Sequence, residues 1–178
     1  MGRQEQTNHL FSNRDLRILL VPLIVEQILN SLMGTADSIM VSNVGSAAIS
    51  AVSLVDSINI LVIQAFYALA AGGTIVCSQY IGQKDKKNAE ESARQLSFVV
   101  ACISSAVMAV CLLTRGPLLR LIFGSVEADV MEAAQIYFFY TALSFPFIAL
   151  YDAGSSIYRA QGNTRLPMTI AVVSNGLN

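Results

Sequence analysis

The sequence predicts an all-α membrane protein built as a polytopic bundle of transmembrane helices. Hydrophobic residues make up 54% of the chain and charged residues only 13%, and the mean hydropathy is +0.56. These values are too apolar for an ordinary soluble domain. Four apolar segments also reach the length of roughly 20 residues that a helix needs to cross a bilayer. The lipid bilayer is therefore the expected partner of most of the surface.

The first elements form a polar arm and a predicted helical hairpin. The arm, residues 1–17, lacks the short apolar core and cleavage site of a signal peptide. The first predicted span covers residues 18–42 and contains Pro22, which removes a backbone hydrogen bond and is expected to bend or loosen the helix. An uncharged link at residues 43–51, rich in Gly, Ser and Ala, leads to the second predicted span, residues 53–81.

Two further spans follow. The third is predicted over residues 96–113, and the polar stretch before it, residues 83–95, fits either a solvated loop or the exposed start of that helix. A Gly-Pro pair at residues 116–117 is predicted to end the span and to leave residues 118–123 at the membrane interface. The fourth predicted span covers residues 136–158.

Small residues at every fourth position on two spans favour close helix packing. They are Ser97, Ala101, Ser105 and Ala109 on the third span and Ala68 and Gly72 on the second. The three cysteines, Cys77, Cys102 and Cys111, lie in apolar segments without metal-ligand spacing. We interpret them as packing residues.

The first span carries two carboxylates, Glu26 and Asp37. A carboxylate in hydrocarbon costs roughly 2.5 to 3.5 kcal/mol, so a helix that keeps one usually turns it toward a cavity or a partner. At about 100° per residue, both acids share a stripe about 120° wide with Asn30 and Gly34. The spacing predicts an ion or substrate site on this face, with Asn30 and Met33 as further cavity candidates.

Tyrosines on the fourth span are additional cavity candidates. Tyr140, with Tyr137 and Tyr151, offers aromatic faces that suit flat cations. A place in the aromatic belt at the membrane interface fits these residues equally well.

The remaining charges near the spans are predicted to have structural roles. Asp56 lies near the start of the second span and is interpreted as interfacial. Asp152 and Arg159 are about 10 Å apart along the fourth helix, which is too far for a direct pair unless the side chains converge. We therefore expect separate roles for the two, with Arg159 as a cytoplasmic anchor.

The basic residues predict the orientation. Nine of the eleven Lys and Arg residues lie on one side of the predicted spans: Arg3, Arg14, Arg17, Lys84, Lys86, Lys87, Arg94, Arg159 and Arg165. The positive-inside rule then places the N-terminus in the cytoplasm of a multi-pass protein of the plasma membrane. The links at residues 43–51 and 115–132 would lie outside. Because the basic residues are spread over separate loops, no nucleic-acid partner is expected.

The last apolar segment, residues 166–178, is shorter than the bilayer core. As a helix it would extend roughly 20 Å, against about 30 Å of hydrocarbon. We therefore expect residues 18–178 to be the incomplete N-terminal lobe of a longer transporter. A shortened gene, a fragment and a genuinely short protein all fit this pattern.

Four motifs in order along the chain resemble the multidrug and toxic compound extrusion (MATE) transporters. The linker after the fourth span contains Arg159, Gly162, Asn163, Thr164 and Arg165, followed by Leu166-Pro167-Met168. The other motifs are Pro22 with residues 35–41, Asn43-Val44-Gly45 with Ala47-Ala48, and residues 78–82. A single motif of this kind would be weak, but the set at these spacings is specific.

The resemblance implies one lobe of a transporter with two six-helix lobes, whose C-terminal lobe this chain lacks. Members of the family export amphipathic, often cationic drugs and metabolites in exchange for protons or sodium ions. The resemblance makes Asp37 the cation-coupling acid, and the sodium ligand if sodium is the coupling ion. Pro22 corresponds to the bending position of the first helix. Asn178 corresponds to the asparagine of an Asn-x-x-x-Asp pair in the fifth helix. No cofactor is implied besides the coupling ion.

Three alternatives remain, one in the same broad class and two in other classes. A lipid-linked saccharide flippase of the same superfamily would be expected to carry cationic residues in its cavity, whereas the mid-span charges here are acidic. A membrane enzyme would need a catalytic motif, and the sequence contains no H-E-x-x-H, no G-x-S-x-G and no paired Ser/His constellation. A non-transporting assembly subunit would gain nothing from intramembrane acids. The sequence therefore favours an antiporter of small molecules and not an enzyme.

Overall fold

The computed structural model describes residues 13–177, and this part of the chain folds into five helices without a strand. The helices are α1 (Asn13–Ser42), α2 (Ser46–Gly82), α3 (Lys86–Phe123), α4 (Ala128–Ala160) and α5 (Arg165–Leu177). By length and composition, α1 to α4 can each cross a membrane. The predicted all-α helix bundle is confirmed.

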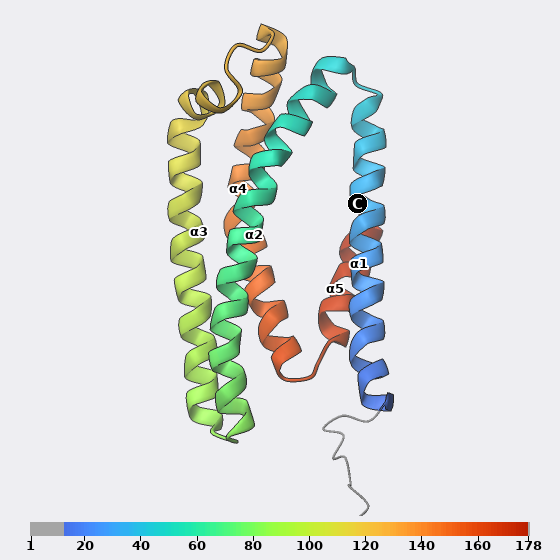
Figure 1. The fold of residues 1–178 in the computed structure, drawn as a ribbon, viewed down its shortest axis with the longest axis vertical. Helices are drawn as coiled ribbons and strands as arrows, with labels where there is room; N and C mark the ends of the chain where they lie inside the picture. The colour runs from blue at the N-terminus through green and yellow to red at the C-terminus, as the bar shows by residue number, and fades with distance from the viewer. Residues whose placement is uncertain (1–12, 178) are drawn as a thin grey trace, which may run out of the picture.

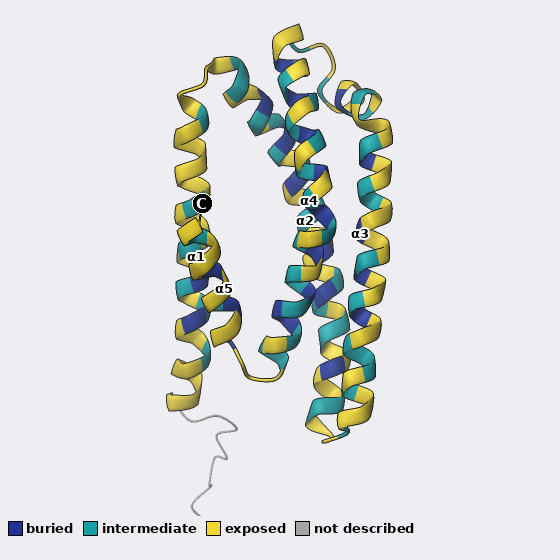
Figure 2. Ribbon diagram, turned by 180° about the vertical axis from the view of Figure 1, so that it is seen from behind, coloured by how far each residue is buried: buried dark blue, intermediate teal, exposed yellow. Residues whose placement is uncertain are grey.

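The five helices form two groups (Figure 1). α2, α3 and α4 pack together along their lengths, and α1 packs mainly against α5. The core lies within the first group, where buried residues concentrate on the facing sides of α2 and α4 (Figure 2). Phe66 of α2 meets Phe145 of α4 edge to face, with ring centroids 5.9 Å apart. Aromatic edge contacts of this kind add to the stabilisation from burial.

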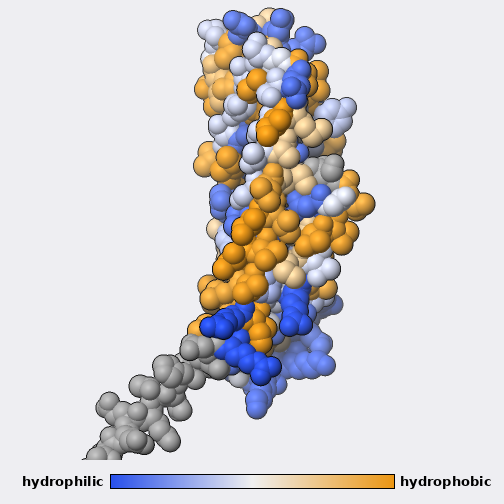
Figure 3. All heavy atoms as spheres, turned by 90° about the vertical axis from the view of Figure 1, so that its right-hand side faces the viewer, coloured by the Kyte–Doolittle hydropathy of each residue, from blue (hydrophilic) through white to orange (hydrophobic). Residues whose placement is uncertain are grey.

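The outer surface of α1 is apolar over most of its length. Ile24, Ile28, Leu32 and Ile39 are all more than half exposed. Figure 3 shows this side of the molecule as a hydrophobic band with hydrophilic residues gathered toward its ends. Such a surface suits lipid, because acyl chains do not penalise exposed aliphatic side chains.

The helices are longer than the apolar spans that the sequence predicts. The link expected at residues 43–51 is shorter, because α2 already begins at Ser46 after Gly45, whose φ is 136°. Most of the polar stretch at residues 83–95 is the exposed start of α3, the second of the two predicted possibilities. The side chain of Asp85 caps this start by accepting a hydrogen bond from Asn88 N at 3.2 Å.

The predicted end of the third helix at residues 116–117 is wrong. α3 continues through Pro117 to Phe123 and ends at Gly124, whose φ is 64°. A proline removes one backbone hydrogen bond but has a φ compatible with a helix, so the turns after it can remain helical. In Figure 1 these last turns leave the direction of the main helix, as a proline kink predicts.

α2 and α3 approach each other closely at Gly73, whereas the sequence analysis selected Gly72 as a packing residue of α2. A Cβ atom added to Gly73 would lie 3.0 Å from Leu96 Cγ and would collide with Leu96 Cδ1, whereas one added to Gly72 would meet open space. On α3, the buried positions are Leu96, Val100, Ser104, Cys111 and Leu119. The row of small residues that the sequence analysis expected to favour close helix packing lies beside these buried positions, and Ser105 and Ala109 are exposed. The glycine of α2 at the close contact is therefore one residue after the glycine that the sequence analysis selected.

The adjacent glycines provide a matched test of this packing. We expect Gly73→Ala to be less stable than Gly72→Ala by about 1 to 3 kcal/mol, because the new methyl overpacks the contact with Leu96. Gly72→Ala should be neutral or stabilising, since alanine is the better helix former by roughly 0.5 to 1 kcal/mol. Thermal unfolding in detergent measures both variants. Equal midpoints would contradict the close approach.

Candidate functional site

Polar side chains meet between the two groups of helices. No Cα atom of α1 lies within 8 Å of a Cα atom of α4, so the two helices are bridged by side chains alone. Residues of α1, α2 and α4 enclose a hollow of about 380 Å³, here called the Glu26 hollow. Its polar lining comprises Glu26, Gln27, Asn30, Gln64, Tyr67, Tyr151, Asp152 and Arg159.

An ion pair crosses this hollow. Arg159 Nη2 donates to Glu26 Oε1 at 2.7 Å, and Tyr151 Oη donates to the same oxygen at 3.3 Å. The Glu26 side chain is 6% exposed and that of Arg159 is 27% exposed. Glu26 Oε2 and Arg159 Nε are buried and have no hydrogen-bond partner. The pair is thus closely held but retains unused hydrogen-bonding capacity facing the interior.

This geometry corrects the role expected for Arg159. The sequence suggested an anchor at the membrane surface, whereas the structure brings its guanidinium inward to Glu26 on another helix. Asp152 lines the same hollow without forming an ion pair with Arg159, in line with the separation predicted along the helix. A charged pair with one partner removed leaves an uncompensated charge in a low-dielectric site, which is costly.

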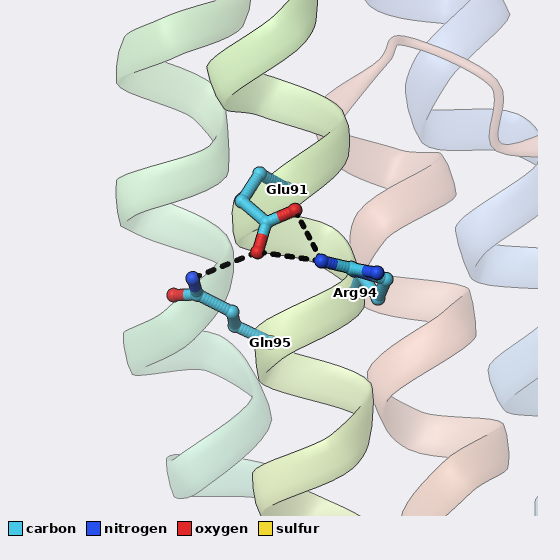
Figure 4. A network of polar contacts seen from close by, with 3 residues as sticks. All are labelled: Glu91, Arg94 and Gln95. Atoms are coloured by element: carbon cyan, nitrogen blue, oxygen red, sulfur yellow. Dashed lines mark hydrogen bonds and ion pairs between the residues drawn. The ribbon is translucent and has the colours of Figure 1, made fainter.

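The Glu91–Arg94 pair at the exposed start of α3 is a useful contrast (Figure 4). Arg94 Nη2 donates to both Glu91 oxygens, at 2.9 and 2.7 Å, and Gln95 Nε2 donates to Glu91 Oε1 at 3.0 Å. The hydrogen bond from Arg94 lowers the pKa of the Glu91 carboxyl. Because water surrounds these groups, the pair contributes little to stability.

Asp37 lies in a second and larger hollow between α1 and α5, here called the Asp37 hollow. Its volume is about 650 Å³, and α1 contributes Asn30, Met33, Gly34 and Asp37 to its lining. Asn30 also lines the Glu26 hollow, as does Tyr151, so the two hollows adjoin. Both acids of the predicted stripe therefore face this connected polar space.

α5 contributes Ser174 and Asn175 to the Asp37 hollow. Asn175 Nδ2 donates to Ala171 O at 2.7 Å, and the amide still has its second N–H and its oxygen for further hydrogen bonds. The sequence analysis did not select Asn175. Asn178, which it did select, lies outside the described residues.

The linker motif has a structural role close to these hollows. Gly162 has a φ of 78°, a left-handed conformation that favours glycine, where the chain turns from α4 to α5. Asn163 Oδ1 accepts from Leu166 N at 3.3 Å at the start of α5. Thr164 is buried, and its hydroxyl donates to Ile18 O in α1 at 3.4 Å. Arg165 is exposed at the first position of α5.

The other predicted cavity residues differ in their placement. Tyr140 is 67% exposed, contacts Phe139 edge to face and does not line either hollow, whereas Tyr151 lines both. Pro22 is buried within α1, one turn before Glu26, and the helix continues through it. Gln64 was missed, although a glutamine in the middle of an apolar span is a recognisable signal.

Comparison with known proteins reveals similarity along almost the whole chain. The MatE family model matches residues 22–178. The chain is 32% identical to the uncharacterized transporter YisQ of Bacillus subtilis (strain 168), over 98% of this chain and 36% of YisQ. It is 26% identical to the probable multidrug resistance protein NorM of Thermotoga maritima, over 93% of this chain and 35% of NorM.

The fold is similar to solved structures as well. A MOP superfamily transporter from Pyrococcus furiosus superimposes with a TM-score of 0.85 at 22% identity, over 92% of this chain and 36% of that one. The chain thus spans about a third of the length of these relatives. The similarity of structure concerns the arrangement of the helices.

The ion pair in the Glu26 hollow can be tested by a double-mutant cycle. We expect Glu26→Gln and Arg159→Gln each to destabilise the protein by on the order of 3 kcal/mol, because each leaves one charge without its partner. The double variant should lose less than the sum of the two. Thermal unfolding in detergent provides the measurement.

The exposed pair on α3 serves as the control for this cycle. Glu91→Gln and Arg94→Gln should barely move the unfolding midpoint, because water solvates either charge left alone. Additive effects at Glu26 and Arg159, as small as those at the exposed pair, would show that no coupled buried pair exists.

Proposed function

Because the chain belongs to the MatE family, we propose that it serves in a membrane antiporter that exports small molecules in exchange for a cation. The observation that carries this proposal is the connected polar space formed by the Glu26 and Asp37 hollows inside a bundle of membrane-crossing helices. Exposed apolar side chains surround these hollows, and a carboxylate in a membrane-crossing segment usually faces a cavity or a partner. The likeness to NorM supports a multidrug substrate class.

Asp37 is the acid that we assign to cation exchange. Glu26 forms an ion pair with Arg159 at 2.7 Å, so a base of the protein balances its charge. Asp37 lies in the larger hollow, beside neutral oxygen-bearing side chains of α1 and α5. A carboxylate in this position can take up a proton or coordinate a sodium ion. Either cation would serve as the coupling ion.

Coupling requires that the cation favour one arrangement of α1 over another. An ion shifts two conformations only by the difference between its affinities for them. Pro22 offers α1 a position with one backbone hydrogen bond missing, where the helix can change direction at low cost. Amphipathic, often cationic drugs or metabolites would then compete with the coupling ion for the same acidic space. Residues 18–178 would form most of the N-terminal lobe of a twelve-helix transporter that works with a C-terminal lobe.

The flippase alternative can be weighed against Arg159. The sequence argument against a flippase assumed that all charges within the spans are acidic, and the structure places a guanidinium in the Glu26 hollow. Its charge is balanced by Glu26, so it provides no net positive site for a lipid phosphate. The negative charge of Asp37 favours a cationic or neutral substrate in its hollow.

Asp37→Asn tests the proposal directly. The substitution is made in the longest natural protein that contains these residues. We expect the rate of cation-driven export to fall about 5- to 150-fold, which is the range typical of coupling between two sites. Asparagine keeps the shape and the hydrogen-bonding capacity but removes the titratable charge. Export is measured in proteoliposomes under separate proton and sodium gradients.

Two other acids control for this experiment. Glu132→Gln, at an exposed position of α4, should leave export unchanged. Glu26→Gln should have a milder effect on export than Asp37→Asn, because Glu26 lies about 16 Å away along α1. Detergent-stable monodispersity reports correct folding. Normal exchange by Asp37→Asn under both gradients would exclude this carboxylate as the coupling group.

We further propose a plasma-membrane location with the N-terminus in the cytoplasm, on the basis of the basic residues. A single cysteine in place of Lys86 should be labelled by an impermeant reagent only after lysis, and one in place of Ser46 also in intact cells. The background lacks Cys77, Cys102 and Cys111. The opposite pattern would reverse the orientation.

A further inference from the structure

A third hollow lies between α2 and α4 and contains neither Glu26 nor Asp37 in its lining, although it shares Ile63 with the Glu26 hollow. Its volume is about 290 Å³, and its polar lining consists of Asp56, Asn59, Tyr137, Thr141 and Ser144. Asp56 was predicted to be interfacial because the second span was expected to begin near residue 53. Since α2 begins at Ser46, Asp56 lies about 15 Å along the helix, and it is half-buried against α4.

The hydrogen bonds of this cluster leave its acceptor atoms in excess. Tyr137 Oη donates to Asp56 Oδ1 at 3.1 Å, and Asn59 Nδ2 donates to the same oxygen at 3.3 Å. Thr141 Oγ1 donates to Phe138 O at 3.2 Å, and Ser144 Oγ donates to Thr141 O at 2.7 Å. Both hydroxyl protons are therefore used within α4, and the oxygen lone pairs remain available to the hollow.

The amide oxygen of Asn59 is the atom that points to a ligand. Asn59 is 7% exposed, its Oδ1 is buried, and no hydrogen-bond donor reaches that oxygen. An acceptor buried without a partner costs about 1 to 3 kcal/mol, and nearly all such groups in proteins are satisfied. Asn59 is one of the residues that line the hollow, together with a carboxylate and two hydroxyl-bearing side chains.

We propose that this hollow binds a monovalent alkali cation, with sodium as the natural occupant. The available groups are hard oxygen acceptors, and they include a single carboxylate. One positive charge neutralises Asp56, whereas a divalent ion would leave a net charge in a low-dielectric site, which is unfavourable. Within residues 13–177, no cluster of three or more His, Cys, Asp or Glu residues provides a divalent site.

A bound sodium ion would join α2 to α4 through oxygens of both helices. These two helices form the centre of the hydrophobic core, so the ion would stabilise the group that contains α2, α3 and α4. Stabilisation by a ligand grows with the ratio of its concentration to its dissociation constant. This site does not depend on the transport proposed for Asp37, and each can fail without the other.

The test separates the Asp56 site from any sodium bound at Asp37. The purified natural chain with Asp37→Asn is placed in choline chloride, and radioactive sodium binding and the unfolding midpoint are followed as sodium replaces choline at constant ionic strength. We expect saturable binding and a rise in the midpoint. Adding Asp56→Asn or Asn59→Leu should weaken the binding at least tenfold, and Ser57→Ala, an exposed neighbour on α2, should leave it unchanged.

A gain-of-charge variant keeps the test informative if Asn59→Leu misfolds. Asn59→Asp supplies a second carboxylate, so it should retain cation binding and acquire calcium binding that the parent lacks. Loss of all saturable sodium binding in the Asp37→Asn background would overturn the proposal. The proposal would also be overturned by a second result. In that result, Asp56→Asn leaves sodium binding unchanged, and Asn59→Asp leaves it unchanged and acquires no calcium binding.

Discussion

The Glu26–Arg159 ion pair joins two groups of helices whose backbones do not touch where it forms. α1 reaches α4 only through side chains, and the ion pair, at 2.7 Å, is shorter than the hydrogen bond from Tyr151 to Glu26. If the pair separated in a bilayer, either charge could be exposed to hydrocarbon, which is unfavourable. The paired state is therefore strongly favoured. The pair holds α1 and α4 apart by the length of two side chains. Space for the Glu26 hollow and the adjoining Asp37 hollow therefore remains between the helices.

The linker after α4 makes this arrangement possible. Gly162 turns the chain, Asn163 caps the start of α5, and buried Thr164 attaches the turn to the beginning of α1. α5 is thereby placed against α1, where it forms part of the lining of the Asp37 hollow. The linker motif, which is part of the family resemblance, thus sets the course of the backbone. It affects the site indirectly, by positioning α5.

The three hollows differ in their charge balance, and this difference suggests different uses. The Glu26 hollow contains an acid whose charge is matched by a base. The Asp37 hollow combines one acid with neutral side chains from three helices. The Asp56 hollow is smaller and presents hydroxyl and amide oxygens around a carboxylate. An exchange site needs a group that can gain and lose its cation, whereas a site within the packed core can hold one continuously.

The sequence by itself determined the helices, the lipid-facing sides and the acidic face of α1, because these depend on local hydropathy and on helical periodicity. Periodicity states which side of a helix a residue occupies, but it does not state which helix lies opposite. The partner of Arg159 is 133 positions away, and the partner of Asp56 on α4 is 81 positions away. Likewise, only the packing of α2 against α3 decides that Gly73, and not Gly72, lies against the Leu96 side chain. These choices follow from the packing of whole helices, where each contact depends on the positions of all the others.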